Sequence, residues 1–180
     1  SAASDVYKRQ VVNETSLEER TRKKKEGIRM SNTADAIVVI DLQKGVCFDS
    51  SPIHELETVT ALVNKRIKTY ETIGKPVIFV QHEDDQLVPQ TKPWEILSEL
   101  SIPEHSYFVR KTHANSFYKT NLSVLLTELD CHSIELCGAQ AEYCIDTTVK
   151  FAHGLGYQLM MCRGATTTYD NPFMLSLIHI

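Results

Sequence analysis

Short apolar stretches alternate along most of the chain with longer segments in which apolar residues recur at helical spacing. The short stretches are rich in β-branched residues, which is typical of strands buried on both faces of a sheet. We predict five such strands, at residues 36–41, 76–81, 106–111, 133–138 and 157–162.

Four helices are predicted between these strands. In the first, Ser51 offers an N-cap and Pro52 the first helical position, apolar residues recur from Leu56 to Tyr70, and Gly74 ends the helix. The other three cover residues 93–100, 121–129 and 142–156. This alternation predicts an α/β fold, a doubly wound (Rossmann-like) parallel sheet of five to six strands flanked by helices, with right-handed crossovers.

The two ends of the chain do not continue the pattern. Residues 1–29 lack periodicity and finish in a run of charged side chains, so we interpret them as a disordered or extraneous leader. Residues 30–174 form the predicted folded domain, beginning at Met30. The last six residues, 175–180, are interpreted as a foreign tail.

Composition and charge exclude several classes of partner. The chain has 180 residues, of which 42% are hydrophobic and 23% charged, as in ordinary soluble domains. Its net charge is −4 and its basic residues concentrate in the leader, which argues against a nucleic-acid partner. No apolar run has the length of a membrane span or of a signal-peptide core. We therefore expect a cytoplasmic protein that binds neither nucleic acid nor membrane; the small-molecule substrate that we also expect is implied by the family resemblance given below.

The cysteines predict free thiols. They are odd in number and none is in a CxxC spacing, which argues against a disulfide framework or a zinc knuckle. The five are Cys47, Cys131, Cys137, Cys144 and Cys162. We expect four of them to be small packing residues. The exception is Cys144, which heads a predicted helix just after the fourth strand.

Three chemically active side chains stand at the carboxyl ends of predicted strands. Asp41 ends the first strand, Lys111 ends the third, and the fourth runs into the loop that carries Cys144. Ligands of open parallel sheets bind beyond these ends, where the strand order reverses. A helix N-terminus and a lysine favour a thiolate, and a carboxylate can take the thiol proton. The pattern alone equally allows an ordinary strand-end aspartate, a solvated lysine and a packing cysteine.

Three motifs, in this order, carry a resemblance to a known family. They are VVIDLQKG around Asp41, VRKTHANSFYKTNL around Lys111 and LCGAQAEYCIDTTVKFAHGLGY around Cys144. Together with GATTTYDN near the end, they resemble the isochorismatase-like cysteine hydrolases, which are the nicotinamidase-related amidohydrolases. The resemblance covers about residues 34–172 and implies a doubly wound α/β sheet.

The resemblance also implies a mechanism for cleaving a small amide or carbamoyl-type C–N bond. Asp41 would accept the proton of Cys144, the sulfur would attack the carbonyl carbon, and water would release the acyl-cysteine. Lys111 would hold the aspartate–thiol pair electrostatically. The backbone N–H groups of Gln140 and Cys144 would form an oxyanion hole after a cis peptide bond between Ala139 and Gln140.

Five further residues are candidates for binding the substrate, namely Gln43, Phe48, Trp94, Phe117 and Glu142. Gln43 could orient the substrate or only hydrogen-bond its own loop. The aromatic residues could line a pocket or pack in the core. Glu142 could shape the pocket or only stabilise the start of a helix.

We expect no catalytic metal and no cofactor. Nicotinamidases carry a D-x-H-x-x-x-H metal motif after the second strand, whereas QHEDDQLVP here has ligand types in another order. Its His82 is expected at the edge of the site or as a hydrogen-bonding residue. Isochorismatases proper lack the cysteine, so Cys144 favours C–N hydrolysis; ether hydrolysis and a non-catalytic binding or redox-sensing member are the alternatives. By the same resemblance we expect a homo-oligomer, a dimer or a tetramer.

Overall fold

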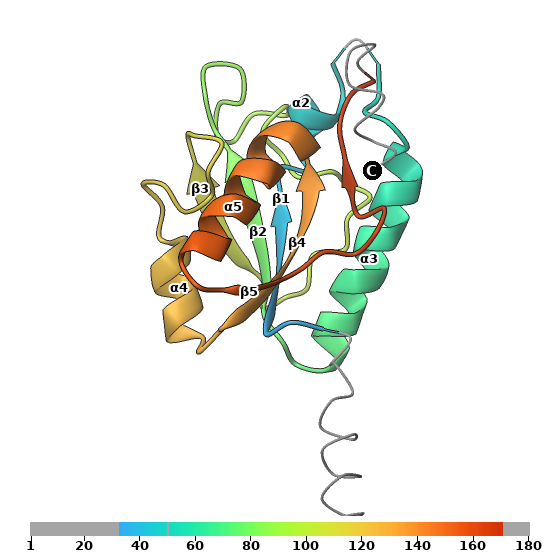
Figure 1. Cartoon of the computed structure of the whole chain (residues 1–180). Coiled ribbons are helices and arrows are strands. Elements are labelled where there is room, and N and C mark those ends of the chain that lie inside the picture. The colour runs from blue at the N-terminus through green and yellow to red at the C-terminus, as the bar shows by residue number, and fades with distance from the viewer. Residues whose placement is uncertain (1–32, 50, 171–180) are drawn as a thin grey trace, which may run out of the picture. The chain divides into compact units, whose positions relative to one another are not determined.

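The computed structural model describes residues 33–49 and 51–170, so the predicted leader and tail lie outside the described residues. The strands of the described part form one six-stranded sheet in which every pairing is parallel. Their order is β3-β2-β1-β4-β5, and β6 pairs with the carboxyl end of β4 (Figure 1). The strands are β1 (Ala36–Ile40), β2 (Val77–His82), β3 (Tyr107–Lys111), β4 (Ser133–Ala139), β5 (Gln158–Met160) and β6 (Thr166–Thr167).

Helices cover both faces of the sheet, which confirms the doubly wound α/β fold. The helices are α2 (Lys44–Cys47), α3 (Leu56–Thr72), α4 (Leu122–Glu128), the π-helical turn η1 (Ala141–Ile145) and α5 (Asp146–Gly154). Side chains of β1 alternate between the two faces, as expected for a strand. Ile37 and Val39 join the core beneath α3, whereas Val38 and Ile40 join the core beneath α4 and α5 (Figure 1).

The strand order reverses between β1 and β4, and this brings their carboxyl ends together. Ile40 pairs with Gly138 at that point. Gly138 has a φ of 119°, and a Cβ there would lie 2.0 Å from the carbonyl oxygen of Ile40. Only glycine fits such a close approach. The chain leaving β4 therefore passes directly beside the residue that follows β1.

The prediction of a helix at 93–100 is wrong. The N–H of Leu97 donates to the carbonyl of Leu42 (3.0 Å), and Ile96 forms an isolated antiparallel bridge with Gln43. Ile96 and Leu97 therefore pair with the residues that follow β1, whereas Trp94, Glu95 and Leu100 make local turn hydrogen bonds. The pairing with a distant segment takes the place of a helix, and the local sequence does not reveal it.

The start of the first helix also differs from the prediction. Pro52 forms an antiparallel bridge with Phe48 instead of opening the helix. The helix begins at Leu56, after Glu55 in a left-handed conformation (φ 48°). The sequence did not predict β6, which is a short strand within GATTTYDN.

The cysteines other than Cys144 largely match their predicted packing role. Cys47, Cys131 and Cys137 are buried free thiols. Cys162 is only half-buried, because it lies in the loop after the short edge strand β5. No helix in the described part of the chain combines the length and apolar character needed to cross a bilayer.

A fully buried carboxylate, Glu135, connects β4 to α3. It accepts hydrogen bonds from Nε and Nη2 of Arg66 and from the hydroxyl of Tyr70 (2.8 Å). That hydroxyl in turn accepts a hydrogen bond from the N–H of Ala34 (2.7 Å), just before β1. The network therefore fixes α3 to the middle of the sheet, and its stability depends on the guanidinium that neutralises Glu135.

Replacing Arg66 with methionine is expected to lower the free energy of unfolding by about 3–5 kcal/mol, because it leaves the charge of Glu135 buried without its partner. Urea denaturation followed by circular dichroism measures this. The matched control is Lys68→Met, which breaks an exposed pair with Glu71 and should cost less than about 1 kcal/mol. Equal effects of the two substitutions would contradict the assigned role of Arg66.

Candidate active site

Asp41 lies where β1 ends, in a left-handed conformation. Its φ is 51°, which an aspartate adopts more readily than most residues. Its N–H still donates to the carbonyl of Val80 in β2 (2.9 Å), so the chain leaves the sheet only after this residue. The carboxylate is 2% exposed, and its Oδ1 atom is buried without a formed hydrogen bond in the described part of the chain.

Lys111, the last residue of β3, brings the elements of the site together. Its buried Nζ lies 2.7 Å from Oδ2 of Asp41, 3.3 Å from Sγ of Cys144 and 3.1 Å from Nδ1 of His82. An ammonium group has three N–H donors and no acceptor, so these three contacts match its full capacity. Residues from β1, β2, β3 and the turn after β4 thus meet around one cation.

Cys144 lies in η1, at the start of the continuous helix formed by η1 and α5. The carbonyl of Gln140 accepts hydrogen bonds from the N–H groups of Tyr143 (3.1 Å) and Ile145 (3.2 Å), which closes this turn tightly behind β4. The Ala139–Gln140 peptide bond is cis, as the resemblance implied. No hydrogen-bond acceptor for the N–H of Gln140 is found among the described residues, so this donor is open to a ligand.

The Cys144 thiol keeps its proton at neutral pH. Burial, and next the negative charge of Asp41, raise its pKa to about 12, and Lys111 offsets only part of this. The sequence-based expectation that a lysine and a helix N-terminus favour a resting thiolate is therefore not met. Desolvation of the sulfur, which the sequence does not show, outweighs the charge of Lys111.

The same burial changes the acidity of Asp41. Removal from water raises the pKa of its carboxyl, and the charge of Lys111 and hydrogen bonds from Lys111 and Cys144 oppose the rise. A carboxylate whose pKa is raised is a better proton acceptor than a solvated one. The geometry therefore provides a base beside a protonated thiol.

His82, expected at the edge of the site or as a hydrogen-bonding residue, forms a hydrogen bond with Lys111 inside the site. Because the Lys111 ammonium can only donate, Nδ1 of His82 accepts and its proton lies on Nε2, 3.4 Å from Oδ2 of Asp84. Burial and the charge of Lys111 lower the pKa of His82, so the ring is neutral. The sequence did hold a clue to this role, because His82 is the last residue of β2, at the edge where the other site residues lie.

A cavity of about 720 Å³ opens above these groups. Asp41, His82, Gln140 and Cys144 line it, together with residues of α2 and of the loop that follows β2. It lies beyond the carboxyl ends of β1 and β4, where the strand order reverses, as is general for doubly wound sheets. Among the described residues, no group of three or more His, Cys, Asp or Glu side chains is arranged to hold a metal ion.

Gln43 hydrogen-bonds its own surroundings rather than facing this cavity. Its Nε2 donates to the carbonyls of His82 and Trp94 (both 2.9 Å), and its Oε1 accepts from the N–H of His82 (2.7 Å). The side chain is fully buried. Of the two interpretations of Gln43, the structure therefore favours the loop-holding one.

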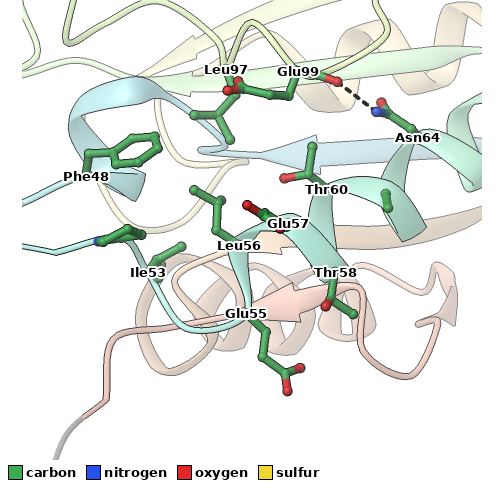
Figure 2. A pocket seen from close by; sticks show the side chains of 12 residues that line it. Phe48, Ile53, Glu55, Leu56, Glu57, Thr58, Thr60, Asn64, Leu97 and Glu99 are labelled. Atoms are coloured by element: carbon green, nitrogen blue, oxygen red, sulfur yellow. Dashed lines mark hydrogen bonds between the residues drawn. The ribbon is translucent and has the colours of Figure 1, made fainter.

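Phe48 lies in a different cavity. This second cavity, of about 640 Å³, is formed by Phe48 with residues of α3 and of the loop before β3, including Ile53, Leu56 and Leu97 (Figure 2). The chain turns after α2, so Phe48 and Val46 lie on different cavities although they are two residues apart. The prediction that Phe48 lines the active site is therefore not supported.

The other predicted substrate-binding residues are not among the described residues that line the active-site cavity. Phe117 is 7% exposed and packs against Phe151 and Tyr157 in the core beneath α4 and α5. Trp94 lies against the guanidinium of Arg110, 5.8 Å from its ring centroid. Glu142 lies in η1, with Oε2 buried and without a hydrogen bond in the described part.

Comparison with known proteins identifies the family of this fold. Residues 35–173 match the family model of the isochorismatase domain. The secreted isochorismatase effector Isc1 of Verticillium dahliae is 28% identical over 147 residues, which cover 79% of this chain and 77% of that protein. A crystal structure of an isochorismatase family protein is similar with a TM-score of 0.74 at 43% identity, over 76% of this chain and 82% of the other.

A more distant solved structure has the same fold. N-carbamoylsarcosine amidase from Thermoplasma acidophilum is similar with a TM-score of 0.69 at 21% identity, over 80% of this chain and 92% of that one. The family match extends over the sheet and includes Asp41, Lys111 and Cys144. The chain therefore belongs to the isochorismatase-like cysteine hydrolase family.

Proposed function

We propose that this isochorismatase-family hydrolase cleaves the C–N bond of a small amide or carbamoyl-type compound through an acyl-cysteine. One observation carries the proposal. The buried ammonium of Lys111 lies within hydrogen-bonding distance of both the Asp41 carboxylate (2.7 Å) and the Cys144 sulfur (3.3 Å), beneath a cavity that both of the latter line. A base, a thiol and a fixed positive charge are the parts that nucleophilic acyl transfer needs.

The first half-reaction forms a thioester. As Sγ of Cys144 bonds to the carbonyl carbon, its proton passes to Asp41, whose Oδ1 has no other hydrogen bond in the described part. Lys111 stays protonated and stabilises the negative charge, whether this charge lies on the Asp41 carboxylate or on the Cys144 sulfur. The carbonyl oxygen becomes an oxyanion that accepts hydrogen bonds from the N–H groups of Gln140 and Cys144. When the C–N bond breaks, Asp41 returns its proton to the leaving nitrogen.

The second half-reaction reverses these roles. Water attacks the thioester carbon, Asp41 takes a proton from the water, and the C–S bond breaks as Cys144 recovers the proton. The raised pKa of Asp41 makes its carboxylate a stronger proton acceptor than a solvated one, which favours both proton transfers. The enzyme returns to its starting protonation state without an external base.

The known proteins support C–N rather than ether cleavage only indirectly. The similar solved structure from Thermoplasma acidophilum is that of an N-carbamoylsarcosine amidase, and at 21% identity it supports a fold that accommodates such chemistry. A thiol at the base of the cavity is the further support, since a covalent acyl intermediate has no role in the hydrolysis of a vinyl ether.

The test is a screen of small primary amides, ureido compounds and nicotinamide, read by ammonia release. Samples quenched during turnover are then weighed as intact protein by mass spectrometry. We expect an acyl adduct on the wild type and on the matched control Cys162→Ser, whose thiol is also half-buried, and none on Cys144→Ser. Undiminished ammonia release by Cys144→Ser, or cleavage of a vinyl ether without an adduct, would overturn the proposal.

A further inference from the structure

Two aspartates outside the catalytic group lie on the wall of the active-site cavity. Asp49 follows α2, and Asp84 follows β2. Oδ1 of Asp84 accepts hydrogen bonds from the N–H groups of Gln86 and Leu87 (both 2.8 Å), and these bonds lower its pKa, so it is ionised at neutral pH. Its Oδ2 lies 3.4 Å from Nε2 of His82 on the same wall. The entrance to the catalytic group is therefore negatively charged.

No lysine or arginine of the described part balances these charges within the cavity. Neither lysine nor arginine is among the described residues that line it. Lys111 lies beneath, where its charge is matched by Asp41 at 2.7 Å. Two basic side chains of neighbouring elements are paired with carboxylates outside the cavity, in the pairs Lys44–Glu95 and Arg110–Glu83. An anionic group entering the cavity would thus meet only like charge.

At the base of the cavity, Asp41 and Cys144 lie together, so a substrate that reaches the thiol must pass the wall that carries Asp49 and Asp84. We infer that the substrate carries a positive charge, or none, on the part that lies away from its scissile amide, and that Asp49 and Asp84 select it. The inference rests on the proposed amide hydrolysis at Cys144. It disfavours carboxylate-bearing amides, ureido acids included, because like charges across an interface reduce both association rate and affinity.

Three amides of nearly equal size separate charge from shape. β-Alaninamide is cationic, butyramide neutral and succinamate anionic, with the charged group attached to the same carbon in the two charged amides. Near neutral pH we expect kcat/KM for ammonia release to fall in that order, by about tenfold from the first to the last. The order should weaken in Asp49→Asn and Asp84→Asn and at high salt, and persist in Glu57→Gln, whose carboxylate lines the other cavity (Figure 2). Faster turnover of succinamate than of β-alaninamide would overturn the inference.

A second readout does not require amide hydrolysis. Under mildly alkaline conditions, the rates at which anionic iodoacetate and neutral iodoacetamide alkylate Cys144 are compared with their rates on free glutathione. We expect iodoacetate to be disfavoured several-fold at Cys144, and less so in Asp49→Asn. If no amide is hydrolysed but this discrimination holds, the proposed function fails and the charge selection stands. Equal relative rates for the two reagents would contradict the charge selection itself.

Discussion

Replacing Asp41 with asparagine should slow amide hydrolysis by about 10³-fold while making Cys144 react faster with iodoacetamide. Removal of the general base accounts for the loss of turnover. The faster alkylation follows because the carboxylate raises the pKa of Cys144, so its loss allows Lys111 to stabilise the thiolate. Asparagine is the suitable replacement, since it tolerates the left-handed φ of 51° at this position.

The pH dependence of Cys144 alkylation shows in which direction the substitution shifts the pKa of the thiol. With the pKa of Cys144 raised to about 12, the wild-type rate should climb with pH throughout the alkaline range. In Asp41→Asn the same rise should begin at lower pH. The matched control is Asp146→Asn, an exposed residue paired with Lys150, which should leave the profile unchanged. A profile in Asp41→Asn that equals the wild type would mean that the thiol does not interact with this carboxylate.

Replacing Lys111 with methionine should abolish measurable turnover, by about 10⁴-fold or more, and also destabilise the fold by about 3–5 kcal/mol. The charge of Lys111 lowers the pKa of Cys144 and opposes the rise that burial causes in the pKa of Asp41. Without Lys111, both the thiolate and the carboxylate are therefore destabilised. In contrast to Asp41→Asn, alkylation of Cys144 should become slower. Ammonia release, alkylation kinetics and urea denaturation measure the three effects.

The double variant Asp41→Asn, Lys111→Met separates stability from catalysis. Since it leaves neither charge buried alone, much of the lost stability should return, whereas turnover should not. The matched control for the single change is Lys150→Met, in which an exposed ion pair is broken at a cost below about 1 kcal/mol. A double variant that is as unstable as the sum of the two single variants would show that the two side chains do not form a coupled pair.

Much of the fold and the three central site residues could be predicted from local signals. A strand buried on both faces is a short continuous apolar run, and the predicted positions of β1 to β4 agree with the structure to within about two residues. Asp41 and Lys111 stand where such runs end. Parallel strands place their carboxyl ends at one edge, so the meeting of these residues with Cys144 follows from order along the chain.

The prediction that failed, and the alternatives that stayed open, depended on partners distant in sequence. The segment 93–100 has a helical pattern, but part of its backbone pairs with residues after β1. For Phe48 and Phe117 the sequence left a pocket wall and core packing as alternatives; Phe48 lines the second cavity and Phe117 packs in the core. Nothing within a few residues of either distinguishes a pocket wall from a packing site.

By itself, the sequence determined the parallel sheet, the family and the identity of Asp41, Lys111 and Cys144, because each is encoded by residue type and spacing over short stretches. Only the tertiary structure decided the proton on the thiol, the contact of His82 with Lys111 and the acidic wall formed by Asp49 and Asp84. The physical reason is that desolvation and charge–charge interaction depend on distance in space and on exclusion of water. Neither is set until chain segments far apart in sequence have packed together.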